Sequence, residues 1–139
     1  MSKAFTSEET PDAAPLIRPA PRLAPGEIRY VTPEGQAELR ETLSRLRTAR
    51  DPRESQVAET LAVLTVLGPE GAPEGQVAFG TWVTVRDAEG ILHTWRIVGP
   101  DEADPRRGLV SAHAQVGRAL LGAGPGDPGI VGRPGGRLE

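Results

Sequence analysis

Two acidic side chains, those of Asp51 and Glu54, flank Pro52 in the segment LRTARDPRESQVAE, residues 46–59. Carboxylate oxygens are hard ligands that suit a divalent cation such as magnesium, which can activate water for hydrolysis. The same residues also suit the start of a helix, with Asp51 as the N-cap and Pro52 as the first helical residue. Glu54 would complete a capping box, which contributes about 1 kcal/mol to helix stability. We favour the helix start and assign neither carboxylate a catalytic role.

The segments on either side of this turn are predicted to be helices that fold back on each other. Thr32 is a favoured N-cap residue and Pro33 suits the first helical position, whereas Asp51 precedes a proline, so the first helix should end by about Arg50. Apolar residues at spacings of four and three form one stripe on each segment: Leu39, Leu43 and Leu46, then Val57, Leu61, Leu64 and Leu67. These stripes predict a short antiparallel hairpin with arms of about 16 residues, or roughly 25 Å.

The hairpin also carries a basic face. Its arginines lie within one short stretch: Arg40, Arg45, Arg47, Arg50 and Arg53. Such a density suits contact with RNA or with an acidic surface of a partner. It also suits arginines that solvate an amphipathic helix beside Glu41 and Glu59, and no aromatic residue is interleaved to stack on bases.

Composition excludes several kinds of site. The 139 residues include no cysteine, which removes disulfides, thiolate zinc sites and cysteine nucleophiles, and only two histidines, His93 and His113. We therefore expect no cofactor. No apolar run approaches the roughly 18 residues that span a bilayer, and no signal-peptide core is present, so we expect a soluble cytoplasmic protein without a membrane partner. A net charge of −3 gives no global reason to expect nucleic-acid binding.

Composition and periodicity divide the chain into four parts. Residues 1–28 are rich in proline and alanine and are predicted to be a disordered tail. The short helical hairpin, a truncated coiled coil, occupies residues 29–68. Glycine and proline mark residues 69–75 as a linker. Residues 76–139 form the remaining domain.

In that last part the apolar period changes to two, which indicates strands. VAFGTWVTVRD and ILHTWRIVG read as two strands joined by a turn at DAEG, with Gly90 able to take the left-handed conformation. RGLVSA is a further short strand, and AQVGRALLG has a helical period. The tail holds at most one short strand, at Ile130 and Val131. Together these elements predict an α+β domain with a small antiparallel sheet and one helix.

Several phrases of this half resemble the C-terminal domain of the GreA/GreB transcription elongation factors. They are FGTWVTV at 79–85, RIVGPDEAD at 96–104, and GRALLG at 117–122 followed by Gly126 and Asp127. YVTPEGQAELRETLSRL, residues 30–46, is similar to the opening of the family's N-terminal coiled coil, and MSKAF resembles the GreB-like branch. The resemblance covers about 30–50 and 76–127.

The resemblance implies an α+β fold in which a helical hairpin precedes an FKBP-like domain. It also implies binding of bacterial RNA polymerase at its secondary channel, where acidic residues at the coiled-coil tip help to hold magnesium and stimulate cleavage of backtracked RNA. From it we expect a monomer with polymerase as partner and only indirect contact with nucleic acid in the elongation complex. The positions expected to meet the polymerase are Asp101, Glu102, Asp104, His113, Gln115 and Arg118, the first three as an exposed acidic cluster.

Three departures from the family pattern modify these expectations. The arms are several turns shorter, and the family's tip run of the type Gly-Asp-(Leu/Arg)-(Ser/Lys)-Glu-Asn-Ala is absent. His113-Ala114-Gln115 stands where the family has an acidic-Ser-Pro element that contributes to polymerase contact. The chain stops at RPGGRLE, where the family closes its sheet with a final strand, so we expect an unpaired sheet edge.

The leading hypothesis is therefore an RNA polymerase-binding elongation regulator that is not an enzyme and does not stimulate cleavage. The alternatives are a genuine cleavage-stimulating factor that uses Asp51 and Glu54, or a degenerated paralogue. A prolyl isomerase would rest on fold analogy alone, and five aromatic residues leave little from which to build a proline pocket.

Overall fold

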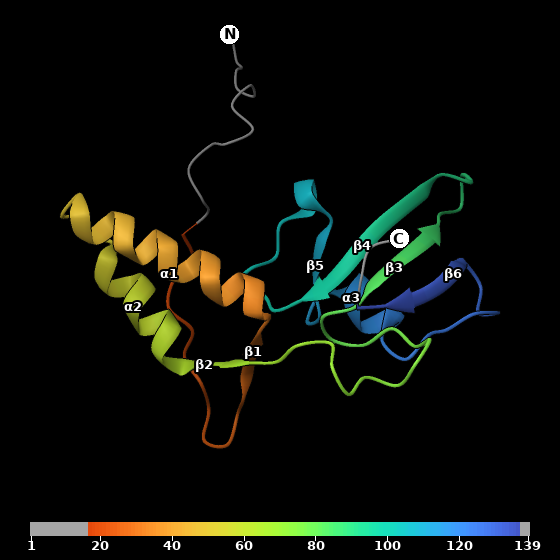
Figure 1. The fold of residues 1–139 in the computed structure, drawn as a ribbon, viewed down its shortest axis with the longest axis horizontal. Helices are drawn as coiled ribbons and strands as arrows, with labels where there is room; N and C mark the ends of the chain where they lie inside the picture. The colour runs from red at the N-terminus through yellow and green to blue at the C-terminus, as the bar shows by residue number, and fades with distance from the viewer. Residues whose placement is uncertain (1–16, 137–139) are drawn as a thin grey trace, which may run out of the picture.

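The computed structural model describes residues 17–136, and the predicted tail up to residue 16 lies outside them. The molecule is elongated, with a helical hairpin at one end and a sheet at the other (Figure 1). No helix within the described residues is long and apolar enough to cross a membrane. The elements in chain order are β1 (Arg29–Val31), α1 (Pro33–Thr48), α2 (Glu54–Val63), β2 (Leu64–Val66), β3 (Trp82–Arg86), β4 (Leu92–Val98), the 3-10 helix η2 (Pro105–Arg107), β5 (Leu109–Ser111), α3 (Gln115–Leu120) and β6 (Ile130–Gly135).

Helix α1 begins where the sequence predicts. Thr32 has extended backbone angles, and its hydroxyl accepts a hydrogen bond from the Gly35 amide at 3.0 Å. Pro33 follows as the first helical residue, where its missing amide proton costs nothing. Glu34 lies in the first turn, where the positive end of the helix dipole favours a negative charge.

The helix ends two residues before Arg50, in a turn of the Schellman type. The Asp51 amide donates to the Leu46 carbonyl at 2.9 Å, and the Arg50 amide donates to the Arg47 carbonyl at 3.1 Å. Arg50 occupies the left-handed position that glycine usually takes, with φ of 53°. This conformation brings the Cβ of an L-residue close to its own main chain, so Arg50 is strained.

Helix α2 begins at Glu54, so the predicted start at Pro52 with Asp51 as N-cap is wrong. The Asp51 carboxylate accepts from the Arg53 amide two residues on, which makes a local turn in place of a cap. The Glu54 side chain pairs with Arg47 instead of returning to the Asp51 amide, so the capping box does not form.

The second arm is also shorter than predicted. Residues 64–66 form β2, which pairs in parallel with β1 through Arg29↔Leu64, Tyr30↔Thr65 and Val31↔Val66. Val63, Thr65 and Val66 are β-branched, which favours the extended conformation once a partner strand is available. Helix α2 therefore has 10 residues against 16 in α1.

The predicted stripes do meet inside the hairpin, except at their ends. Leu43, Leu46 and Val57 are buried in one cluster, and Leu39, Ala58 and Leu61 pack against it. Leu64 and Leu67 lie beyond the helix and so cannot continue its stripe. The hairpin core is thus small and aliphatic.

The larger sheet has the strand order β5-β4-β3-β6. β3 and β4 are antiparallel, and the turn between them uses Gly90 with φ of 84°, as predicted. β5 runs parallel to β4, so the prediction of an all-antiparallel sheet is wrong. The reason is the connection through residues 99–108, which crosses back by way of η2 before β5 begins.

The sheet edge beside β3 is occupied, contrary to the sequence prediction of an unpaired edge. β6 pairs antiparallel with β3 through Thr84↔Val131 and Val85↔Ile130, and after a register shift through Trp82↔Gly135. The expected strand at Ile130 and Val131 thus continues through RPG. Proline is tolerated there because β6 is an edge strand.

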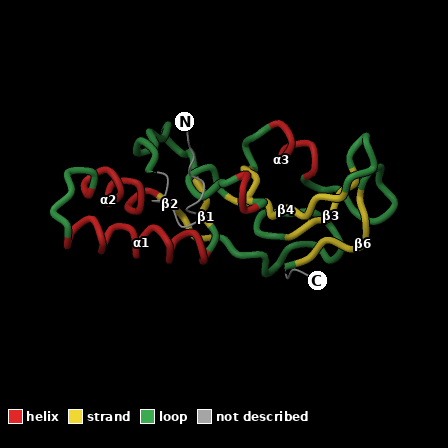
Figure 2. The backbone as a smooth tube through the Cα atoms, turned by 90° about the horizontal axis from the view of Figure 1, so that it is seen from above, coloured by secondary structure: helices red, strands yellow, loops and turns green. Residues whose placement is uncertain are grey.

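One apolar core lies between this sheet and α3. Val77, Val83, Val85 and Ile97 are buried, and Leu120 packs against them from α3. Figure 2 shows α3 on one face of the sheet. The predicted α+β class is confirmed at this level, while the finer FKBP-like description stays a prediction.

The strain at Arg50 leads to a stability prediction. Arg50→Gly should raise the free energy of unfolding by about 1 kcal/mol, because glycine adopts the left-handed position without a Cβ conflict. Ala49→Gly is the matched control: Ala49 has right-handed angles, so glycine there should lower stability by about 0.5–1 kcal/mol. Urea unfolding of both variants gives the comparison. Equal destabilisation by the two substitutions would contradict the turn described here.

Candidate functional site

At the tip of the hairpin both carboxylates are paired with arginines of the hairpin itself. Asp51 Oδ1 accepts from the Arg53 amide at 2.9 Å and from Arg53 Nε at 3.0 Å, and Oδ2 accepts from Arg53 Nη2 at 2.7 Å. Glu54 Oε2 accepts from Arg47 Nε at 2.9 Å. Within residues 17–136 no group of three or more histidine or acidic side chains is arranged to hold a metal ion.

The electrostatics of the tip follow from these contacts. The hydrogen bond from the Arg53 side chain, followed by that from the Arg53 amide, lowers the pKa of Asp51 to about 2. The Asp51 side chain is 22% exposed, so solvent also partly screens its charge. Asp51 therefore remains ionised in ordinary conditions and is held by its neighbour.

The basic face lies exposed along the hairpin, as the sequence predicts, but much of its charge is used locally. Arg45 lies 3.9 Å from Glu41, and Arg47 and Arg53 pair with the tip carboxylates. Arg40 and Arg50 make no ion pair with any residue that the structure describes.

The acidic loop GPDEAD does not form the exposed cluster that the sequence predicts. Asp101 is only 6% exposed, and its Oδ2 accepts from Arg29 Nε at 2.6 Å. Asp104 is half-buried, and its Oδ1 accepts from the Arg106 amide at 3.1 Å, which caps η2. Both carboxylates are thus engaged within the fold, Asp101 by the base of the hairpin and Asp104 by its own loop.

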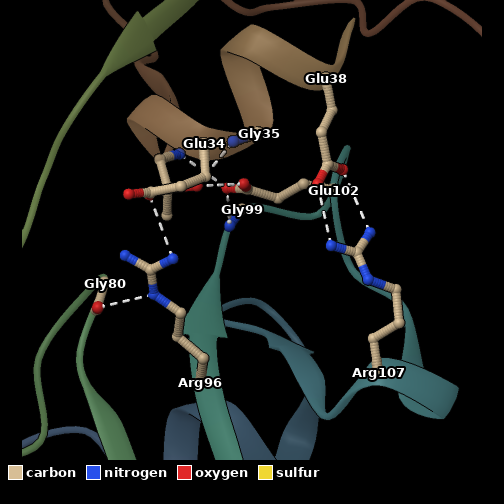
Figure 3. Close-up of polar contacts among 9 residues, drawn as sticks. Glu34, Gly35, Glu38, Gly80, Arg96, Gly99, Glu102 and Arg107 are labelled. Atoms are coloured by element: carbon tan, nitrogen blue, oxygen red, sulfur yellow. Dashed lines mark hydrogen bonds and ion pairs between the residues drawn. The ribbon is translucent and has the colours of Figure 1, made fainter. Parts of the chain in front are cut away.

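Glu102 makes the most extensive of these contacts. Its carboxylate accepts from the Thr32 amide at 2.8 Å, from the Gly99 amide at 2.8 Å and from the Thr32 hydroxyl. The same hydroxyl accepts from Gly35, so Glu102 completes the cap of α1 from another part of the chain (Figure 3). A Cβ at position 35 would collide with Glu102 Oε1, so this approach requires glycine.

Two further ion pairs link α1 to β4 and to η2. Arg96 Nη1 lies 3.1 Å from Glu34 Oε1, while Arg96 Nε donates to the Gly80 carbonyl at 2.9 Å. The Arg107 guanidinium donates to both oxygens of Glu38, at 3.1 and 2.8 Å. Figure 3 shows both arginines reaching up to the first two turns of the helix.

We call this set of contacts the joint; it consists of Arg29, Thr32, Glu34, Gly35, Glu38, Arg96, Gly99, Asp101, Glu102 and Arg107. Sequence reasoning missed most of its members. The spacing of Glu34 and Glu38, one turn apart and thus on one helix face, was a usable signal. Their arginine partners lie more than 60 positions away in the chain, and no local pattern indicates them.

The remaining predicted contact residues gather around α3. His113, Gln115 and Arg118 are all exposed, and the His113 amide donates to the Ser111 hydroxyl at 3.0 Å. The short helix is not capped by a side chain, because Ala114 stands at its N-cap. The three side chains are thus accessible at the surface.

Comparison with known proteins identifies the family. A model described as transcription elongation factor, GreA/GreB, C-term matches residues 72–139. A transcription elongation factor GreA from Alkalilimnicola ehrlichii is 32% identical over 144 residues, which cover 78% of this chain and 91% of that protein. The chain belongs to the GreA/GreB family.

Other GreA/GreB relatives match over a smaller part of their length. A GreB factor from Yersinia pestis is 38% identical over 86 residues, or 62% of this chain and 50% of that protein. The chain thus spans about half the length of such relatives. A solved GreA/GreB structure from Nitrosomonas europaea is 24% identical; the match covers 77% of this chain and 94% of that chain, at a TM-score of 0.36.

The Asp51–Arg53 pair in this GreA/GreB family member predicts a pH effect. Because the folded pKa lies below the ordinary 3.8, the pair stabilises the tip above about pH 4 and is lost as pH falls through about 2. Arg53→Ala should raise the pKa of Asp51 toward 3.8, whereas Arg40→Ala should leave it unchanged. A carboxyl NMR titration gives the value. An ordinary Asp51 pKa in the unsubstituted protein would refute the pairing.

The Glu102 contacts predict a stability effect. Glu102→Gln should lower the free energy of unfolding by about 2 kcal/mol, because an amide cannot accept all three hydrogen bonds and turns a donor toward a backbone N–H. Glu89→Gln, on the exposed β3–β4 turn, should change it by less than about 0.5 kcal/mol. Chemical denaturation followed by far-UV circular dichroism compares the two. A Glu102 variant as stable as the Glu89 variant would show that the joint does not depend on this carboxylate.

Proposed function

We propose that this chain binds bacterial RNA polymerase as an elongation regulator and does not stimulate transcript cleavage. Family membership supports the class of partner, since the relatives are named transcription elongation factors. A polymerase partner also places the protein in the cytoplasm. The chain would act by occupying its site on the polymerase, with no cofactor of its own.

The proposal that the chain does not stimulate cleavage rests on the two tip carboxylates, which are already paired with arginines. A magnesium ion needs free carboxylate oxygens, and here Arg53 and Arg47 already hold Asp51 and Glu54. The tip segment 47–54 contains three arginines and two carboxylates, so its charge is net positive. Such a tip suits a phosphate backbone or an acidic protein wall better than it suits a metal cation.

The length of the hairpin supports the same proposal. At a rise of 1.5 Å per residue, α1 spans about 24 Å and α2 about 15 Å. The pairing of β1 with β2 ends the second arm early, and the joint holds the first arm at its base. A hairpin of this reach suits the entrance of a channel rather than an active centre at its far end.

The exposed residues around α3 are the proposed polymerase contact. His113, Gln115 and Arg118 are exposed at and just before α3. Asp101, Glu102 and Asp104 are committed to internal hydrogen bonds, so we assign them a positioning role instead. The basic face would then contact RNA or the channel wall as the hairpin enters.

The test uses the full chain, RNA polymerase core enzyme from its host, and backtracked elongation complexes with magnesium. We expect binding at micromolar concentration and no increase in the rate of RNA cleavage. Arg118→Glu should weaken binding about tenfold, because one favourable charge contact becomes repulsive. Arg86→Glu, an exposed reversal at the end of β3, is the matched control and should bind normally.

The alternatives give different results in the same assay. Faster cleavage that is lost equally in Asp51→Asn and Glu54→Gln would establish a genuine cleavage-stimulating factor and refute the proposal. Absence of binding, together with a non-cooperative thermal melt, would indicate a degenerated paralogue. Absence of binding by a cooperatively folded protein would also refute the proposed partner.

A further inference from the structure

The segment that precedes β1 lies against the hairpin rather than apart from it. The Ile17 side chain packs on the hairpin cluster formed by Leu43, Leu46 and Val57. From there the chain passes α2 and turns back into β1 (Figure 1). Ile17 thus provides an apolar anchor on the hairpin side.

The next residue reaches the loop that follows β4, which lies against the base of the hairpin. Arg18 Nη1 donates to the Asp101 carbonyl at 2.9 Å, and Nη2 donates to the Ala103 carbonyl. The carbonyl of Arg18 itself accepts from the Gln56 side-chain amide on α2. One residue therefore contacts both the second helix and the loop that follows β4.

These contacts cross a place where the two ends of the molecule do not pack fully. A cavity of about 100 Å³ lies between the hairpin and the loop, and both Ile17 and Arg18 line it. Leu39, Thr42 and Thr60 form its helical wall. Since side chains do not fill this space, packing alone does not hold the hairpin against the loop there.

The joint constrains the hairpin chiefly at its base. Its hairpin-side members lie within residues 29–38, on β1 and the first two turns of α1. Helix α1 is about 24 Å long, so a hairpin held only at its base can still tilt relative to the sheet. Contacts on α2, farther from the base, oppose this tilt more effectively.

We propose that Ile17 and Arg18, here called the strap, set the angle between the hairpin and the sheet. Arg18 is the residue on which the strap depends, because its guanidinium and its carbonyl directly connect the loop that follows β4 with α2. Loss of these hydrogen bonds frees the hairpin to tilt about the joint without unfolding either end. The strap is a conformational device of this chain and does not rest on the proposed partner.

The test uses the full chain and follows the angle between the hairpin and the sheet through the distance between one spin label on each. The protein has no cysteine, so Ser55→Cys near the hairpin tip and Glu89→Cys on the β3–β4 turn accept spin labels cleanly. Double electron–electron resonance should give a narrow distance distribution in the parent. Arg18→Ala should widen it roughly twofold, as expected when a hinge is released. Arg22→Ala, an exposed arginine of the same segment, is the matched control and should leave it unchanged.

A second variant covers the case in which Arg18→Ala does not fold. Gln56→Leu removes the tie to α2 while leaving the guanidinium contacts, and should also widen the distribution with helix content unchanged. Widening in Arg18→Ala or Gln56→Leu, but not in Arg22→Ala, supports the strap. Distributions as narrow as that of Arg22→Ala in every folded variant would overturn it.

Discussion

The structure depends on one carboxylate, that of Glu102, placed at the start of α1. A helix start has amide groups without partners, and Thr32 satisfies the one from Gly35. Glu102 then binds the Thr32 amide and hydroxyl, and binds Gly99 in its own loop. Because the negative charge also meets the positive end of the helix dipole, the contact is favourable in both hydrogen bonding and electrostatics. The hairpin and the sheet are joined through it.

This constraint changes the meaning of the acidic loop. A run such as GPDEAD suggests a solvated surface for a basic partner, yet Asp101 and Glu102 face inward and hold Arg29 and Thr32. Ionised groups with low exposure need partners, and here the partners come from the base of the hairpin. The loop therefore couples the hairpin to the sheet, which leaves the exposed residues around α3 as the partner surface that we propose.

At the tip, too, residues of the fold bind carboxylates that the sequence suggested for another role. Asp51 and Glu54 are residue types that suit a metal site, and their spacing suits a helix cap. They form neither, because both carboxylates accept hydrogen bonds from nearby arginines. Arg50 in the left-handed conformation lets the chain reverse at that point, at a cost in backbone strain. The tip therefore has a net positive charge with both carboxylates paired, which supports the proposal that the chain binds without stimulating cleavage.

The sequence by itself determined the family, the helical hairpin, the start of α1 and the β3–β4 turn, because periodicity, capping residues and Gly90 act over a few positions. Only the tertiary structure decided the rest. The parallel pairing of β1 with β2 shortens the second arm, and the pairing of β6 with β3 closes the sheet edge. Glu102 binds Thr32, 70 positions away, and Arg18 binds partners 38 to 85 positions away; such long-range contacts leave no local pattern to read.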